Sequence, residues 1–256
     1  MLRKPMRVAG AVLALATTLT AWGAQPTYIT AAVSDSARPQ ADSARDSERK
    51  PADMLTFAGV KPGEKVVDLL PGGGYFTRLF SVAVGPKGKV YALAPAKPDT
   101  APADAPDRAA AVKAIAADPH YSNITVIAQP AKQLLQFTLP EPVDMVWTSQ
   151  NYHDLHNIPD ASVPDFDKAV LQALKPGGLF IVLDHSAEDG SGFRDTSTLH
   201  RIDEEAVRKE VEAAGFKFEG KSEVLRNKDD PRTAKVFDAA IRGHTDQFIL
   251  KFRKPK

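Results

Sequence analysis

The sequence predicts a single α/β domain with a doubly wound, mostly parallel seven-stranded sheet. Short apolar runs alternate with segments in which apolar residues recur at helical spacing. Repeated strand–helix units of this length are typical of a parallel sheet that helices cover on both faces. No helix of ordinary length is expected between the last two apolar runs, so we expect an antiparallel edge.

Four strands are expected in the first half of the domain. The apolar run at 65–70 ends at Pro71 and a glycine triplet, after which helical spacing continues over 76–83. A further helix is expected at 108–117. The other strands of this half are expected at 89–94, 124–128 and 143–148.

The second half keeps the same alternation. A helix is expected over 166–174. It should end at Lys175-Pro176-Gly177-Gly178, because proline and glycine disfavour a continuing helix. Asp203 has the side chain of a helix N-cap, and Gly215 is the expected end of that helix. The remaining strands are expected at 179–183, 216–225 and 247–252.

Length, charge and cysteine content limit the possible classes of protein. The 256 residues can bury one substantial core. The 33 Lys and Arg residues nearly balance the 32 Asp and Glu residues, so we expect no nucleic-acid partner. The chain has no cysteine, which excludes disulfides, thiolate metal sites, a cysteine nucleophile and a lipid-modified cysteine. Nothing in the sequence indicates an oligomeric state.

The N-terminal residues 1–24 are expected to be a signal peptide. Basic residues precede a short apolar run at 8–15, and small residues follow it. The run is shorter than the about 20 apolar residues of a spanning helix, so cleavage is favoured over a retained anchor, at a position that stays open. We therefore expect a periplasmic or secreted protein with no integral membrane segment. Residues 25–50 are rich in Ala, Ser, Asp and Arg and predict a flexible linker before a domain at 51–256.

The segment Asp68-Leu69-Leu70-Pro71-Gly72-Gly73-Gly74 joins the first strand to its helix. Ligands of open parallel sheets bind beyond the carboxyl ends of the strands, where glycines let the backbone approach them. The helix that follows points its positive end at such a ligand. This turn is therefore a candidate ligand-binding loop, and a tight strand-to-helix turn without a ligand is the alternative.

Three features together resemble class I S-adenosylmethionine (SAM) dependent methyltransferases, which have a Rossmann-like fold. They are Val66-Val67-Asp68-Leu69 with its glycine turn, Gly88-Lys89-Val90-Tyr91-Ala92, and Leu174-Lys175-Pro176-Gly177-Gly178. A narrower family, exported bacterial predicted methyltransferases, is similar in Asn151-Tyr152-His153-Asp154-Leu155-His156 and Leu183-Asp184-His185-Ser186. The resemblance covers about Pro51 to Lys254.

The resemblance implies a SAM-dependent methyltransferase that acts on an unknown, small acceptor. The residues that it places around SAM are Asp68, Gly72, Gly73, Gly74 and Asn151. In this hypothesis His153 or His185 removes a proton from the acceptor, and Asp184 orients it.

The cofactor positions depart from the family pattern in three places. Leu70 stands where the first motif has glycine. Ala94 or Pro95 stands at the end of the second strand, where the family has the acidic residue that binds the ribose hydroxyls. After the third strand, Gln129 and Pro130 stand where an acidic residue often binds adenine. The loss of two charged acceptors predicts SAM binding that is weaker by about a hundredfold or more.

Histidines and carboxylates follow two neighbouring strands of the expected sheet. The segment 153–156 follows the fourth strand, and Asp184 with His185 follows the fifth, so the two groups should lie side by side. His200 is expected to close over the same rim from a later loop. Three interpretations stay open: residues that hold the loops, a methyl-acceptor pocket, or a divalent metal site made of His153, Asp154, His156 and His185.

The main alternative to methyl transfer is an exported protein with the same fold that has lost SAM binding. Such a protein would use its pocket for another ligand or for a metal. The missing acidic residues and the histidine cluster favour this alternative, and a fold by itself does not decide function.

Overall fold

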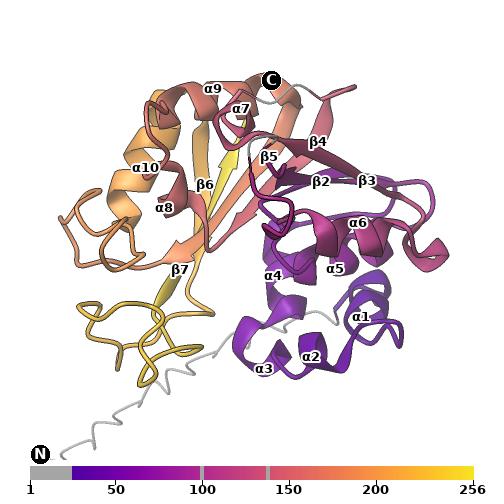
Figure 1. Cartoon of the computed structure of the whole chain (residues 1–256), viewed down its shortest axis with the longest axis horizontal. Helices are drawn as coiled ribbons and strands as arrows, with labels where there is room; N and C mark the ends of the chain where they lie inside the picture. The colour runs from indigo at the N-terminus through magenta and orange to yellow at the C-terminus, as the bar shows by residue number, and fades with distance from the viewer. Residues whose placement is uncertain (1–24, 99–100, 137–138) are drawn as a thin grey trace, which may run out of the picture.

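The computed structural model describes residues 25–98, 101–136 and 139–256 and contains a seven-stranded sheet (Figure 1). The strands lie in the order β3-β2-β1-β4-β5-β7-β6. β1 to β5 run parallel, and β7 runs antiparallel to its neighbours β5 and β6. The predicted doubly wound α/β fold with an antiparallel edge is confirmed. The strands are β1 Lys65–Leu69, β2 Lys89–Pro95, β3 Ile124–Gln129, β4 Val143–Ser149, β5 Leu174–His185, β6 Lys217–Ser222 and β7 Gln247–Arg253.

The central strands are buried on both faces, as their apolar sequences predict. Val66 of β1 packs on one face in the same core as Trp147 of β4. Val67, the next residue, packs on the other face in the same core as Val146. Because successive side chains of a strand point to opposite faces, two apolar cores form, one on each side of the sheet.

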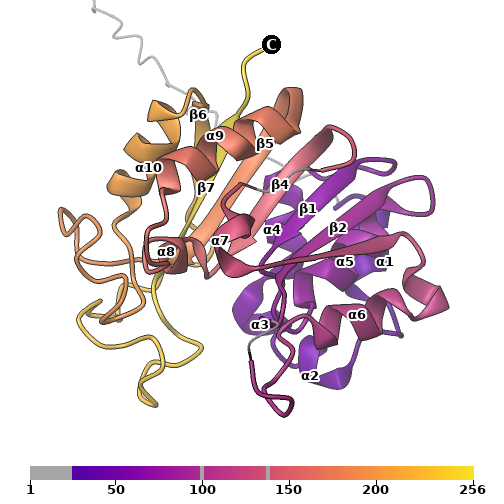
Figure 2. The same cartoon turned by 45° about the horizontal axis from the view of Figure 1, so that its top comes forward.

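Helices cover both faces of this sheet (Figure 2). One face carries α1 (Thr27–Val33), α4 (Pro51–Ala58), α5 (Tyr75–Val84) and α6 (Ala110–Ala116), with α2 (Gln40–Ser43), α3 (Asp46–Arg49) and the 3-10 turn η1 (Pro119–Tyr121) nearby. The other face carries α7 (Ala131–Leu134), α8 (Tyr152–Leu155), α9 (Val163–Ala173) and α10 (Glu204–Ala213). The predicted N-cap Asp203 accepts a hydrogen bond from the amide of Glu205 at 2.9 Å.

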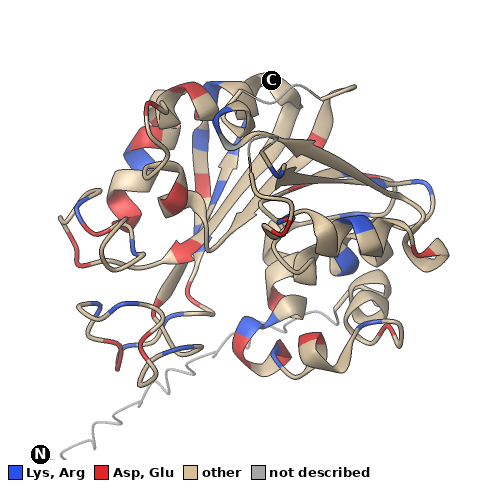
Figure 3. Ribbon diagram, in the orientation of Figure 1, with Lys and Arg blue, Asp and Glu red and all other residues tan. Residues whose placement is uncertain are grey.

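Residues 25–50 correct the expectation of a flexible linker, because they fold as α1, α2 and α3 on the domain. Ile29 of α1 is buried in the same core as α5. Arg38 donates to both carboxylate oxygens of Asp46, at 2.9 and 2.6 Å. Figure 3 shows charges of opposite sign close together at α2 and α3. The segment is poor in large apolar residues, but one apolar helix face and buried ion pairs are enough to hold it.

The expected signal peptide at residues 1–24 lies outside the described residues. In the part of the chain that the structure describes, no helix has the length and apolar character needed to cross a membrane. Export of the protein therefore stays a prediction.

Two elements differ in extent from their predicted ranges. β5 already begins at Leu174, because Gly177 and Gly178 exchange backbone hydrogen bonds with Lys254 at 3.0 and 2.9 Å. The strand expected at 216–225 ends at Ser222. Residues 223–246, called the β6–β7 loop below, then contain neither helix nor strand.

Candidate functional site

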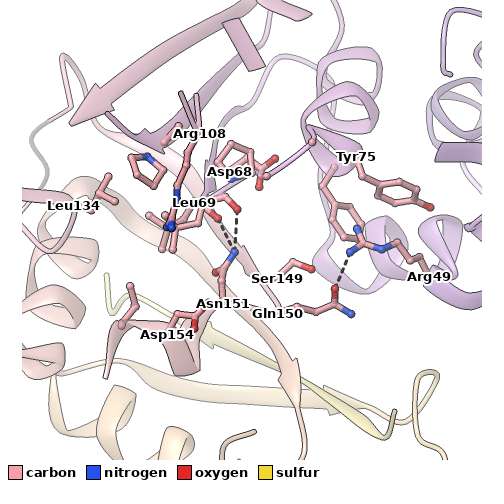
Figure 4. A pocket seen from close by; sticks show the side chains of 18 of the residues that line it. Arg49, Asp68, Leu69, Tyr75, Arg108, Leu134, Ser149, Gln150, Asn151 and Asp154 are labelled. Carbon is pink, nitrogen blue, oxygen red and sulfur yellow. Dashed lines mark hydrogen bonds between the residues drawn. The ribbon is translucent and has the colours of Figure 1, made fainter. Parts of the chain in front are cut away.

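A cavity of about 700 Å³ lies beyond the carboxyl ends of β1, β2 and β4 (Figure 4). The sheet order reverses here, since β1 pairs with β2 on one side and with β4 on the other. Ligands of doubly wound sheets bind at this position. The lining residues are Asp42, Arg45, Arg49, Asp68, Leu69, Leu70, Pro71, Gly72, Gly73, Tyr75, Phe76, Ala94, Pro95, Arg108, Leu134, Ser149, Gln150, Asn151, Asp154, Leu155 and Ile158.

The turn after β1 forms the floor of the cavity, as the glycine pattern predicted. Gly72 has a φ of +54° and lines the cavity. Leu70, which stands where the family has glycine, also has a positive φ of +52°. A left-handed backbone costs a leucine about 1–2 kcal/mol, so this turn holds strain at the place where a ligand would bind.

Gly74 was expected beside the cofactor, but it is not among the residues that line the cavity. It lies before the first residue of α5 and has a φ of +80°. A Cβ at this position would lie 2.2 Å from Cδ1 of Ile115 in α6. Gly74 therefore allows the backbone turn before α5 and the close packing of α5 on α6.

Asp68 lies at the carboxyl end of β1 and is almost fully buried, with 2% of its surface exposed. Burial raises the pKa of its carboxyl to about 7, although Thr77 donates a hydrogen bond to Oδ2 at 2.6 Å and thereby opposes the rise. Asp68 lines the cavity, and Arg49 attracts its carboxyl and lowers its pKa without forming an ion pair with it among the described residues. It can therefore take up a cationic group of a ligand.

Arg49 of α3 also lines the cavity (Figure 4). Its guanidinium donates to Oε1 of Gln150 at 2.7 Å and lies 4.6 Å from the ring centroid of Tyr75. Burial lowers the pKa of Arg49 to about 10, and its Nε has no described hydrogen-bond partner. Among the described residues no carboxylate forms an ion pair with it, although Asp68 and Asp42 attract it from farther away, so the cavity contains a half-buried cation that a ligand anion can neutralise.

Sequence reasoning missed Arg49 because it lies in the segment that was expected to be a flexible linker. Its neighbour Arg45 also lines the cavity. Basic residues alone do not indicate that a segment is ordered or that it lines a cavity. The recognisable signal was Pro51 directly after the segment, at the first position of α4, which marks a helix start and therefore an ordered chain.

Asn151 lines the cavity, as expected, but its side chain is already engaged. Oδ1 accepts a hydrogen bond from Thr148, and Nδ2 donates to the carbonyl oxygens of Leu69 and Leu70 at 3.3 and 3.0 Å. The amide thus joins the ends of β1 and β4. We conclude that Asn151 shapes the cavity and has little capacity left for a ligand.

The opposite side of the cavity is apolar and has no carboxylate at the end of β2. Ala94 and Pro95 line it there, as the sequence indicated, and Gln129 is not among the lining residues. Leu134 lies opposite Arg49 in Figure 4. Leu155 and Ile158 add further apolar surface. This side can hold a flat heterocycle by packing but offers few charged acceptors for hydroxyl groups.

His153 and Asp184 form a buried pair next to the cavity. Nδ1 of His153 lies 2.8 Å from Oδ1 of Asp184, and the His153 amide donates to Oδ2 at 2.8 Å. Burial opposes charge on both groups, but their mutual attraction raises the pKa of His153 and lowers that of Asp184. Neither side chain lines the cavity. An ionised carboxylate can only accept, so the Nδ1 of His153 carries a proton.

Nε2 of His153 points toward two further side chains. It lies 3.3 Å from Nδ1 of His200 and 3.4 Å from Oδ1 of Asp154. The distance from His200 Nδ1 to Asp154 Oδ1 is 3.6 Å. Of these three residues, Asp154 lines the cavity. The expected closure of His200 over the rim is therefore observed.

The other two histidines of the expected metal set point elsewhere. His185 lies 2.7 Å from the hydroxyl of Thr245 through Nδ1, and burial lowers its pKa to about 4. His156 stacks on Phe193 with ring centroids 4.2 Å apart, and its Nε2 lies 3.1 Å from Glu210. The structure thus brings His153 and Asp154 together with His200, and it does not bring His156 or His185 to the same point.

No protein-family model and no curated protein sequence matches the chain. Solved structures do match its fold. A SAM-dependent methyltransferase from Aquifex aeolicus has a TM-score of 0.55 and 18% identity, over 82% of this chain and 98% of that chain. An arsenic(III) S-adenosylmethionine methyltransferase from Chlamydomonas reinhardtii has a TM-score of 0.54 and 17% identity, over 90% and 74%. The cyclase SpnF has a TM-score of 0.55 and 19% identity, over 80% and 82%.

These similarities, with the strand order and the position of the cavity, define the class: the chain has the Rossmann-like fold of class I SAM-dependent methyltransferases. They do not distinguish an exported bacterial family within it. One of the similar structures is a cyclase, so the activity has to be inferred from the site.

Proposed function

We propose that this protein binds SAM in the cavity and transfers its methyl group to a small acceptor. The observation that carries the proposal is that the cavity is lined by two opposite charges, the half-buried Arg49 and the buried Asp68, which attract each other but form no ion pair.

The methionine end of SAM is complementary to these two groups. Its carboxylate would neutralise the Arg49 guanidinium, and its ammonium group would lie against Asp68. Hydrogen bonds between charged groups are stronger than neutral ones, and the low dielectric of a buried wall strengthens them further. The zwitterion therefore supplies the two partners that the protein leaves out.

The adenosine end would pack against the apolar side formed by Leu134, Leu155 and Ile158. Ala94 and Pro95 offer no carboxylate to the ribose. Each missing charged acceptor costs about 1.5–3 kcal/mol, so we expect an affinity at least about tenfold below that of a site with this acceptor.

In the proposed reaction a nucleophilic atom of the acceptor attacks the methyl carbon of SAM. A new bond to the methyl carbon forms, the carbon–sulfur bond breaks, and the sulfur keeps its electron pair. The products are the methylated acceptor and S-adenosylhomocysteine, and the acceptor loses one proton. We place the acceptor near Asp154, because this residue lines the cavity and its carboxylate lies 3.4 Å from Nε2 of His153.

We also propose that the protein is exported, because residues 1–24 have the sequence of a signal peptide. Cell fractionation tests this. Recovery of a shortened protein outside the cytoplasm supports export, and recovery of the full-length protein in the cytoplasm contradicts it.

Calorimetric titration of the purified protein with SAM and with S-adenosylhomocysteine tests the proposed function. We expect both to bind with one molecule per chain, because both carry the zwitterionic methionine end. Absence of binding at millimolar SAM, with the protein folded by circular dichroism, would contradict the proposal. The cavity would then serve another ligand.

A further inference from the structure

We infer that His153, Asp154 and His200 form a binding site for a divalent first-row transition metal ion, with Zn²⁺ as the probe ion. This site lies next to the cavity, and the binding of the ion itself does not depend on the proposed methyl transfer.

The three facing atoms have the spacing of metal ligands. Their separations are 3.3 Å between the two ring nitrogens, 3.4 Å from His153 Nε2 to the carboxylate, and 3.6 Å from His200 Nδ1 to the carboxylate. Ligand atoms about 2.1 Å from a tetrahedral Zn²⁺ lie about 3.4 Å from one another. The three atoms thus already have the separations that three corners of such a tetrahedron require.

The chemistry of the ligand set fits the same ion. Two imidazole nitrogens and one carboxylate oxygen are common ligands of Zn²⁺ and related ions. Sites with three protein ligands keep a coordination position for water or substrate. Among the described residues this is the group of histidines and carboxylates whose ligand atoms converge.

In proteins, a metal-binding histidine usually donates its second ring N–H to a carboxylate or a carbonyl oxygen, and Asp184 is the acceptor for His153. Its carboxylate accepts the Nδ1 proton of His153, so in the neutral imidazole the lone pair is on Nε2, the nitrogen that faces His200 and Asp154. Asp184 is itself fixed, since it accepts hydrogen bonds from the amides of His153 and His185, each at 2.8 Å. A carboxylate that orients a metal-bound imidazole in this way typically contributes about 10–100-fold to affinity.

The backbone holds His200 in an unusual conformation at this point. Its φ is +56°, in the left-handed region that side chains other than glycine rarely adopt. Its neighbour Arg201 is completely buried, and the amide of Ile202 donates to the carbonyl of His185 at 3.0 Å. The ring centroids of Phe237 and His200 lie 4.8 Å apart in an edge-to-face arrangement. Strain of this kind persists where the surrounding structure fixes a functional side chain.

An ion at this site would lie at the margin of the SAM cavity, because Asp154 belongs to both. If the proposed methyl transfer holds, the open coordination position would bind the acceptor atom and lower its pKa, so that its proton leaves to solvent before attack. This role rests on the proposed function, whereas the binding of the ion does not.

Metal-free full-length protein, prepared with a chelator, is titrated with Zn²⁺ by calorimetry and then with Co²⁺ by visible absorption. We expect one ion per chain and a Co²⁺ spectrum of low coordination number. His200→Ala and Asp154→Asn should each weaken Zn²⁺ binding at least tenfold. Both side chains are partly exposed, so these variants are expected to fold.

His120→Ala and His156→Ala are the matched controls. His120 is an exposed histidine that pairs with Asp35, and His156 faces Glu210. Both variants should bind Zn²⁺ as the wild type does. An equal loss in His156→Ala, or unchanged affinity in His200→Ala, would overturn the proposed ligand set, and no stoichiometric binding would overturn the site. SAM titration of the metal-free protein separates this result from the proposed function.

Discussion

Arg201 and Asp230 form an ion pair through two hydrogen bonds, at 2.8 and 3.0 Å, and neither side chain is exposed to solvent. Arg201 also donates to the carbonyl oxygens of Ser186 and Ala234 at 2.9 Å. The pair joins the segment that carries His200 to the β6–β7 loop, which contains Asp230. It therefore fixes the backbone beside the candidate metal site.

Asp230→Ala should lower the free energy of unfolding by about 3–5 kcal/mol, because it leaves the buried guanidinium of Arg201 without its counter-charge. Denaturant unfolding followed by circular dichroism measures this change. Asp189→Ala is the matched control, since Asp189 pairs with Arg232 while its side chain is 96% exposed. A similar loss in both variants would contradict a special role of the buried pair.

The ligand-free protein should become less stable as the pH rises from the pKa of Asp68 in the unfolded chain to its pKa in the folded protein. The pKa of Asp68 is about 7 in the folded protein and about 3.9 in an unfolded chain. Between these two pKa values the folded state holds a proton on Asp68 that the unfolded state has lost. The free energy of unfolding therefore decreases as the pH rises over this interval, and the decrease is complete above it.

Asp68→Asn tests this directly, because the amide can still accept the hydrogen bond from Thr77 and does not titrate. Denaturant unfolding between about pH 5 and about pH 8 should show a flatter pH dependence for the variant, and a gain in stability relative to the wild type toward the alkaline end. Identical slopes for the two proteins would show that Asp68 ionises normally.

Gly74→Ala should destabilise the protein by about 1–3 kcal/mol, because φ at this position is positive and the new methyl group meets Ile115. Gly73→Ala is the control: its Cβ would meet nothing within 4 Å, and we expect a change within about 0.5 kcal/mol. Thermal and denaturant unfolding measure both. Equal stability of the two variants would contradict the packing role of Gly74.

The fold was predictable because it follows from local patterns. The apolar runs at β1, β2, β4 and β5 are buried on both faces, and the turn after β1 has the glycine that its backbone requires. The role of Gly74 was not predictable, because it depends on the position of Ile115, which is distant in sequence. The same holds for Arg49: its own segment shows no motif, and only the folded chain places it on the cavity wall.

The histidine cluster shows the same limit. The sequence indicated that the ends of β4 and β5 meet, and His153 does contact Asp184. His156 lies about one helical turn after His153, but sequence spacing did not show that its ring stacks on Phe193. His200 does contact His153, as expected from the sequence. The sequence did not show that Arg201, next to His200, would be buried and paired with Asp230. Both facts depend on tertiary packing, which a single sequence does not display.

The central claim is that the methionine end of SAM lies between Arg49 and Asp68. The most direct test is calorimetric titration of the wild type and of Arg49→Gln with SAM and with decarboxylated SAM, which lacks the carboxylate. Arg242→Gln, a substitution of an exposed arginine, is the control. We predict that the wild type prefers SAM by about 10–150-fold, that Arg242→Gln keeps this preference, and that Arg49→Gln loses it. An Arg49→Gln protein that is folded and still prefers SAM to the same extent would contradict the account.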